Sequence, residues 1–174
     1  MKKIEEYVRS IPDFPEPGII FRDITSVLQD KDGLQLAIES MQGLVKDLDF
    51  DVVVGPESRG FIFGVPIAYN LKKSFVPVRK KGKLPCETIE KEYALEYGTA
   101  TIEIHKDAIQ PGQKVVIIDD LIATGGTIEA ITELIEQLGG EVVKIAFLME
   151  LEGLEGRKKL GKYDVDAVIK YPGK

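Results

Sequence analysis

Short, continuous runs of β-branched residues recur along this chain, and amphipathic segments separate them. The clearest run is KVVII at 114–118, and DVVVG at 51–55 is a second. A continuous apolar run of this length is typical of a strand that is buried on both faces. One face of a helix after the first run is marked by Ile128, Ile131, Leu134, Ile135 and Leu138. The alternation predicts an α/β protein with a parallel twisted sheet, right-handed crossovers and helices on both faces.

The remaining elements are predicted from the same kinds of pattern. We expect further strands at 74–78, 99–104, 142–149 and 166–171. We expect helices at 2–10, 33–47 and 61–71, with Asp32 as the N-cap of the second. Three prolines and a glycine at 12–21 indicate an ordered irregular segment. Residues 79–98 are charged and weakly periodic, which predicts a long connection of a kind that is usually functional or mobile.

Composition narrows the class of protein. The 174 residues fit one domain, 1–174, and no run of about 18 apolar residues predicts a membrane span. The net charge of −6 argues against a general nucleic-acid binder, whose binding surface would be basic. The N-terminus has no apolar run typical of a secretory signal. A single cysteine, Cys86, excludes an internal disulfide and favours a reducing compartment, so we expect a cytoplasmic protein without membrane or nucleic-acid partners.

A constellation of small and acidic residues follows the clearest strand. Asp119 and Asp120 come directly after VVII, and the stretch 123–127 (ATGGT) then opens the next helix. Glycines let backbone N–H groups converge on an anion, and a helix N-terminus adds a favourable dipole. The carboxylates would repel a phosphate, so ribose hydroxyls or a hydrated magnesium ion are their natural partners. The ordered whole predicts a sugar-phosphate site, although each dipeptide alone is explained by a solvated strand end or a plain turn.

Other phosphate motifs do not fit this stretch. No lysine follows the glycines, as a P-loop requires, and no G-x-G-x-x-G follows the strand. A basic run around Gly82 adds positive charge to an otherwise acidic chain, and it consists of Arg79, Lys80, Lys81 and Lys83. Such a run is usually a solvated turn, and it gains meaning only beside an anionic ligand.

The stretch VVIIDDLIATGGT, at 115–127, resembles the signature of the type I phosphoribosyltransferases. The resemblance covers nearly the whole chain, from FPEPGIIFRDI through GPESRGF, RKKGKLP and LEYG to MELEGLEGR. PGIIFRD together with GPESRGF and KLP…LEYG narrows it to the adenine-using branch of that family, in its short bacterial form. The resemblance implies the type I fold with a small N-terminal hood at about 1–30 and a flexible catalytic loop at about 79–98.

The resemblance also implies which residues bind phosphoribosyl pyrophosphate. Asp119 and Asp120 would hold the ribose 2- and 3-hydroxyls, and the loop formed by Ala123, Thr124, Gly125, Gly126 and Thr127 would bind the 5-phosphate. A loop of Glu57, Ser58, Arg59 and Gly60 would bind pyrophosphate, and in relatives its Glu-Ser peptide can be cis. The charge on pyrophosphate would be met by Arg59, Arg79, Lys80 and Lys83.

For adenine, the resemblance implies a pocket with Phe21 on one face of the base, Leu151 near the other, and Leu121 nearby. The backbone of Ile20 and Arg22 would contact the edge of the base. A backbone C=O beside the exocyclic amine selects adenine, since a 6-oxo base would leave that carbonyl unpaired. Without the resemblance, ordinary core packing explains Phe21.

Glu96 aligns with the family's candidate catalytic acid, with Tyr97 beside it, and Arg59 is the second candidate catalytic residue. Proton exchange with a ring nitrogen suits Glu96, because the attacking nitrogen loses a proton during the reaction. His105, the only histidine, is assigned no role.

The implied reaction converts adenine and phosphoribosyl pyrophosphate to AMP and pyrophosphate in purine salvage. The implied cofactor is Mg²⁺, bound through substrate and water rather than by protein ligands, and the implied assembly is a homodimer. Two alternatives stay open: a 6-oxopurine or xanthine phosphoribosyltransferase, and a non-catalytic regulator that senses phosphoribosyl pyrophosphate.

Overall fold

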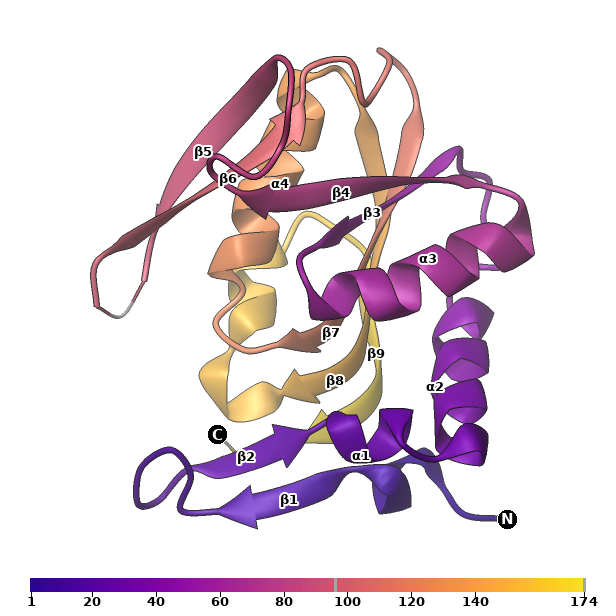
Figure 1. The fold of residues 1–174 in the computed structure, drawn as a ribbon, viewed down its shortest axis with the longest axis vertical. Coiled ribbons are helices and arrows are strands. Elements are labelled where there is room, and N and C mark those ends of the chain that lie inside the picture. Colours follow the sequence, from indigo (N-terminus) through magenta and orange to yellow (C-terminus); the bar gives the residue numbers. More distant parts are fainter. Residues whose placement is uncertain (96, 174) are drawn as a thin grey trace.

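The computed structural model describes residues 1–95 and 97–173, and a seven-stranded sheet forms its centre (Figure 1). In spatial order the strands are β5 (Thr88–Ala94), β6 (Thr99–His105), β4 (Ser74–Lys80), β3 (Val52–Pro56), β7 (Lys114–Ile122), β8 (Glu141–Leu151) and β9 (Val165–Tyr171). The five strands from β4 to β9 pair in parallel, whereas β6 is antiparallel to both β4 and β5. The predicted α/β class with a largely parallel sheet is confirmed.

Helices cover both faces of this sheet, as the alternation predicts. α2 (Lys31–Gly43) and α3 (Arg59–Leu71) lie on one side of β7 and β8, and α4 (Gly126–Gln137) lies on the other (Figure 1). Successive residues of one strand separate the two cores, because Val53 packs on the α3 side and Val54 on the α4 side. No helix in residues 1–95 and 97–173 combines the length and apolar character needed to cross a bilayer.

The first 30 residues form a separate small layer. A 3₁₀ turn, η1 (Ile4–Tyr7), leads into β1 (Arg9–Pro12), which pairs antiparallel with β2 (Ile20–Asp23), and α1 (Thr25–Leu28) follows. The expected helix at 2–10 is therefore wrong beyond one short turn. Its later residues instead pair with β2, in the register Arg9↔Asp23 and Ile11↔Phe21. Local sequence patterns do not reveal this pairing.

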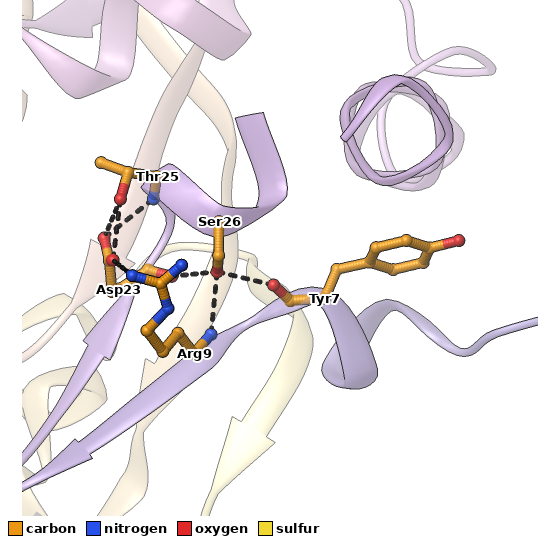
Figure 2. A network of polar contacts seen from close by, with 5 residues as sticks. All are labelled: Tyr7, Arg9, Asp23, Thr25 and Ser26. Atoms are coloured by element: carbon orange, nitrogen blue, oxygen red, sulfur yellow. Dashed lines mark hydrogen bonds and ion pairs between the residues drawn. The ribbon is translucent and has the colours of Figure 1, made fainter. Parts of the chain in front are cut away.

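Polar contacts fix this layer to α1, as Figure 2 shows. Ser26 Oγ accepts a hydrogen bond from the Arg9 amide at 2.9 Å and donates to the Tyr7 carbonyl at 2.7 Å. The Asp23 carboxylate accepts from the Thr25 amide at 2.9 Å and lies 3.9 Å from Arg9 Nη1. The hydrogen bonds from Thr25 are the main reason why the pKa of Asp23 is lowered, with smaller contributions from Arg9 and Arg59.

Two other predicted boundaries are wrong. α2 spans Lys31–Gly43 rather than 33–47. It begins earlier because Asp30 rather than Asp32 is its N-cap, and Asp30 accepts hydrogen bonds from the amides of Asp32 and Gly33. The expected connection at 79–98 contains β5, which forms a hairpin with β6 that extends past the sheet beside α4 (Figure 1). Its charged sequence conceals a strand because Lys91 lies between Ile89 and Tyr93 on the face that packs toward α4.

Candidate active site

Two loops meet where the order of the parallel strands reverses. β3 and β7 are parallel neighbours, but β3 continues through α3 to β4 on one side, whereas β7 continues through α4 to β8 on the other. The chain therefore leaves these two strands in opposite directions and opens a crevice at their carboxyl ends, which is the usual ligand site of open α/β sheets.

A cavity of about 260 Å³ occupies this crevice. Its lining comes from the ends of β3 and β7 and the turns that follow them: Pro56, Glu57, Arg59, Asp119, Asp120, Leu121, Ile122, Ala123, Thr124, Gly125, Gly126, Thr127 and Ile128. The sequence signature thus forms most of one wall, and the Glu57–Arg59 turn forms the wall that faces it.

The two aspartates lie inside β7, which runs to Ile122 rather than ending at the expected Ile118. Asp119 Oδ1 accepts a hydrogen bond from the Asp120 amide at 2.8 Å. The side chain of Asp120 is buried, and its Oδ2 lies 3.2 Å from Arg59 Nε but makes no hydrogen bond within the described residues. Burial, followed by the nearby charge of Asp120, raises the pKa of Asp119 well above its usual value. Two carboxylates with unused acceptor capacity suit hydroxyl donors or a hydrated cation.

The turn from β7 to α4 depends on close backbone packing. Gly125 precedes the helix at φ +83°, where other residues are strained, and a Cβ there would lie 2.6 Å from the Gly156 carbonyl oxygen. Gly125 has no side chain to cap α4, so the first amides of the helix stay available to an anion in the cavity. The backbone of Gly156, the first residue of η3 (Gly156–Leu160), therefore packs directly against this turn and leaves no room for a side chain at position 125.

The turn after β3 ties the basic run to the crevice. The Glu57–Ser58 peptide is cis, as the resemblance implies, and Arg59 begins α3. Glu57 Oε1 accepts a hydrogen bond from the Lys80 amide at 2.7 Å and lies 3.4 Å from Arg79 Nε. The Lys80 amide is the main cause of the lowered pKa of Glu57, and the charge of Arg79 adds to it. Glu57 therefore stays ionised and holds the end of β4 beside the turn after β3.

The expected base-binding residues gather at the same edge of the sheet. β2 lies beside the carboxyl ends of β8 and β9 (Figure 1), and the Arg22 guanidinium stacks 3.9 Å from the centre of the Tyr171 ring. Tyr171 in turn pairs with Leu151, the last residue of β8. Phe21 is half-buried and packs edge-on against Phe14, with ring centres 5.4 Å apart. Contacts between strands thus place β2, which carries Phe21, beside the end of β8, which carries Leu151.

Not every expected site residue lines the cavity. Within residues 1–95 and 97–173, the lining excludes the expected residues Ser58, Arg79, Lys80, Lys83, Leu151 and the three base-side residues of β2. Lys83 is exposed in the turn after β4, whose amides are held by the Glu103 carboxylate. The candidate acid Glu96 falls outside the described residues.

Two contacts at the site have only weak signals in the sequence. Tyr93 Oη accepts a hydrogen bond from Thr127 Oγ1 at 3.1 Å, but the mixed charges of β5 hide the strand. The buried carboxylate of Glu150 forms a paired hydrogen bond with Arg157, at 2.7 and 2.8 Å, and so fixes the segment that carries Gly156. The glycines of LEGLEGR are the one signal that could have indicated a close approach there.

Comparison with known proteins agrees with this geometry. Residues 23–171 match the model of the phosphoribosyl transferase domain. The chain is 81% identical to the adenine phosphoribosyltransferase of Lachnoclostridium phytofermentans over 174 residues, which is all of both chains. It is 68% identical to the adenine phosphoribosyltransferase of Agathobacter rectalis, again over all of both chains.

Solved structures give the same result. The crystal structure of adenine phosphoribosyltransferase from Thermoanaerobacter pseudethanolicus has a TM-score of 0.92 and 55% identity, over 97% of this chain and 98% of that one. The enzyme of that name from Saccharomyces cerevisiae, complexed with adenine and an imino-altritol bisphosphate, has a TM-score of 0.88 and 40% identity. That match covers 95% of this chain and 96% of the yeast chain.

Proposed function

The chain belongs to the adenine phosphoribosyltransferases, and we propose that the crevice between the β3 and β7 turns is where it carries out that reaction. The enzyme transfers ribose 5-phosphate from phosphoribosyl pyrophosphate to adenine and yields AMP and pyrophosphate. The observation that carries the placement is the convergence of two carboxylates, a glycine turn at a helix N-terminus and Arg59 on one cavity.

In this proposal the sugar phosphate lies along the β7–α4 turn. The 5-phosphate accepts hydrogen bonds from the first amides of α4 and from the hydroxyls of Thr124 and Thr127. The ribose hydroxyls donate to Asp119 and Asp120, whose acceptor atoms have few protein partners within the described residues. Ala123 supports the arrangement because it leaves room for the phosphate to approach the backbone.

Pyrophosphate lies toward the opposite wall. Arg59 contributes its charge there from the start of α3, beside the backbone of Glu57 and Ser58. Glu57 has a supporting role, since its carboxylate holds the Lys80 amide and the Arg79 guanidinium beside the cavity. Arg79, Lys80 and Lys83 then meet leaving-group charge from the end of β4 and the turn after it, either in this subunit or across a dimer.

Adenine lies between the hood and the ends of β7 and β8. Phe21 stacks on one face of the base, Leu151 lies near the other, and Leu121 closes the side next to β7. The backbone of Ile20 and Arg22 contacts the base edge, where a carbonyl accepts from the exocyclic amine. A 6-oxopurine presents an acceptor at that point and would leave two acceptors facing each other.

The chemical step replaces the bond between the sugar C1 and pyrophosphate with a bond to a ring nitrogen of adenine, with inversion at C1. The transition state has oxocarbenium character, so positive charge grows on the sugar while negative charge grows on the leaving group. Arg59 and the basic residues stabilise the leaving group, and Glu96 exchanges a proton with the base. A 79–98 segment that closes over the site would exclude water, which competes with adenine for the sugar.

Magnesium fits this donor set. The carboxylates of Asp119 and Asp120 are hard oxygen donors, and Asp120 Oδ2 has no hydrogen-bond partner among residues 1–95 and 97–173. They would hold the ion through water and the ribose hydroxyls. When bound with the substrate, the ion neutralises negative charge on pyrophosphate.

The proposed assembly is a homodimer. The helix α3 exposes Val65 and Tyr69, whose exposed fractions are 47% and 82%, on a helix that is otherwise apolar and packed against the sheet. An exposed apolar surface that begins at the Arg59 turn suits a second copy, which could then add charge to the site. Sedimentation equilibrium tests this by the mass of the particle, and a strictly monomeric active enzyme would contradict it. A cytoplasmic location is proposed from the exposed free thiol of Cys86.

Magnesium-dependent AMP formation is the direct test of the proposal. Purified protein with adenine, phosphoribosyl pyrophosphate and Mg²⁺ should release AMP and pyrophosphate in equal amounts. Omission of adenine should stop pyrophosphate release, and chelation of the metal should stop AMP formation. Binding of phosphoribosyl pyrophosphate without turnover would favour a regulator instead.

A further inference from the structure

The side chain of Tyr93 reaches from the β5–β6 hairpin to the first turn of α4. Its hydroxyl lies 3.1 Å from the hydroxyl of Thr127, which lines the main cavity. Its ring covers Gly126, where a Cβ would lie 3.7 Å from Tyr93 Cδ2. A residue of β5 therefore contacts two residues of the proposed 5-phosphate turn.

The position of Tyr93 is fixed from both sides. In the hairpin it pairs with Ala100 of β6. Two residues earlier on the same face of β5, Lys91 Nζ lies 2.6 Å from Glu133 Oε2 on α4. This ion pair gives the strand a second contact with the helix, so the contributions of Lys91 and Tyr93 can be tested separately.

The Thr127–Tyr93 hydrogen bond has a consequence for phosphate binding. Either hydroxyl can be the donor in this contact, because a hydroxyl both donates and accepts. A phosphate oxygen accepts but does not donate, so Thr127 must turn its proton toward the phosphate when substrate binds. Tyr93 can then donate its own proton to Thr127 Oγ1 at the same oxygen–oxygen distance, which strengthens the outward hydrogen bond of Thr127.

We propose that Tyr93 is a positioning residue for the 5-phosphate, which acts by donating to Thr127 when the phosphate is bound. The inference rests on the proposed placement of the 5-phosphate at the β7–α4 turn. It adds a residue outside the cavity lining, and it couples the β5–β6 hairpin to occupancy of the phosphate site.

The substitution Tyr93→Phe tests this because it removes one oxygen and keeps the ring over Gly126. The hydrogen bond is present with and without substrate, so Tyr93→Phe removes only the strengthening that the charged phosphate adds, and the KM for phosphoribosyl pyrophosphate should rise by about 2-fold. The KM for adenine should not change. Inhibition by ribose 5-phosphate, which carries the 5-phosphate alone, should weaken by the same factor, whereas inhibition by pyrophosphate should not change.

A double-mutant cycle separates this inference from its premise. Thr127→Ala should raise the KM for phosphoribosyl pyrophosphate, and adding Tyr93→Phe to it should cause no further rise. If Thr127→Ala leaves that KM unchanged, the 5-phosphate placement is wrong and the role of Tyr93 falls with it. If Thr127→Ala raises the KM but Tyr93→Phe does not, or if its effect persists in the Thr127→Ala background, only the role of Tyr93 is overturned.

Two control variants complete the experiment. Lys91→Gln removes the ion pair to Glu133 without contacting Thr127, and Tyr163→Phe removes a tyrosine hydroxyl that hydrogen-bonds Glu136 further along α4. Both should leave inhibition by ribose 5-phosphate unchanged. A loss with Lys91→Gln equal to that with Tyr93→Phe would overturn the inference in favour of simple anchoring of the hairpin.

Discussion

Asp119 lies where ionisation of a carboxylate is unfavourable. The strand ends bury it and Asp120 adds like charge, so its pKa is raised in the folded protein above the value of about 3.9 expected in the unfolded chain. Between these two pKa values the folded state binds more protons than the unfolded state. The contribution of Asp119 to the free energy of unfolding therefore falls as the pH rises through this window. Asp119, a residue of the proposed ribose site, thus destabilises the folded protein.

Asp119→Asn should accordingly raise the melting temperature at neutral pH. The asparagine oxygen can still accept from the Asp120 amide, while the like charge is removed. The gain over the parent should grow as the pH rises through the window and disappear below the pKa of the unfolded aspartate. Calorimetry across this pH range measures it, and a variant that is less stable than the parent at neutral pH would contradict the argument.

Activity should change in the opposite direction. Asp119→Asn combined with Asp120→Asn removes two charge-assisted hydrogen bonds to ribose, each of about 1.5–3 kcal/mol, so kcat/KM should fall on the order of 10²- to 10⁴-fold. Circular dichroism should show an intact fold. Near-normal turnover would refute the assignment of these carboxylates to the ribose.

Phe21 is the residue that separates base binding from sugar binding. Phe21→Ala removes an aromatic face whose stacking on a base is typically worth about 1–3 kcal/mol, so the KM for adenine should rise by about 5- to 150-fold. The KM for phosphoribosyl pyrophosphate should change much less. Phe14→Ala removes the ring that packs edge-on against Phe21 and indicates how much of the effect is support. Equal changes in both KM values would place Phe21 outside the base pocket.

At the scale of elements, the β7–α4 turn depends on its contact with η3. A Cβ on Gly156 would lie 2.8 Å from Ile122 Cγ1, and the Glu150–Arg157 ion pair prevents the segment from moving away. Gly156→Ala should therefore displace the turn, at a cost of about 1–3 kcal/mol in stability, and raise the KM for phosphoribosyl pyrophosphate.

The matched control for this substitution is Gly161→Ala in the same part of the chain. A Cβ on Gly161 would make only an ordinary contact, 3.6 Å from the Lys158 carbonyl oxygen. Steady-state kinetics and thermal melts of both variants check the prediction. If Gly156→Ala behaves like Gly161→Ala, the packing of η3 does not set the shape of the phosphate turn.

The elements also show which parts of the fold a sequence can predict. Buried strands such as Val52–Pro56 are predictable because burial on both faces demands a continuous apolar run. The strand at Thr88–Ala94 is not, because Lys91 interrupts the apolar positions on the face that packs toward α4. The N-cap of α2 is predicted wrongly for a different reason, since Asp30 and Asp32 are the same residue type and only the backbone geometry decides between them.

At the scale of the whole molecule, the candidate site is assembled by topology. The residues of the signature are adjacent in sequence, so the resemblance indicates them directly. Tyr93 and Gly156 reach the same turn from β5 and η3 through contacts that no local pattern encodes. The base-binding residues are only partly predictable from the sequence. A recognisable motif indicates Phe21, but the placement of β2 against the sheet depends on contacts such as that of Arg22 with Tyr171.

The most direct test of the central claim is competition among bases for one pool of phosphoribosyl pyrophosphate. Adenine, hypoxanthine, guanine and xanthine are supplied together with Mg²⁺ at equal concentrations, and the nucleotides formed are separated and quantified. The account predicts AMP as the dominant product, because a backbone carbonyl facing the exocyclic amine rejects a 6-oxo base. Preferential formation of a 6-oxopurine nucleotide would contradict it.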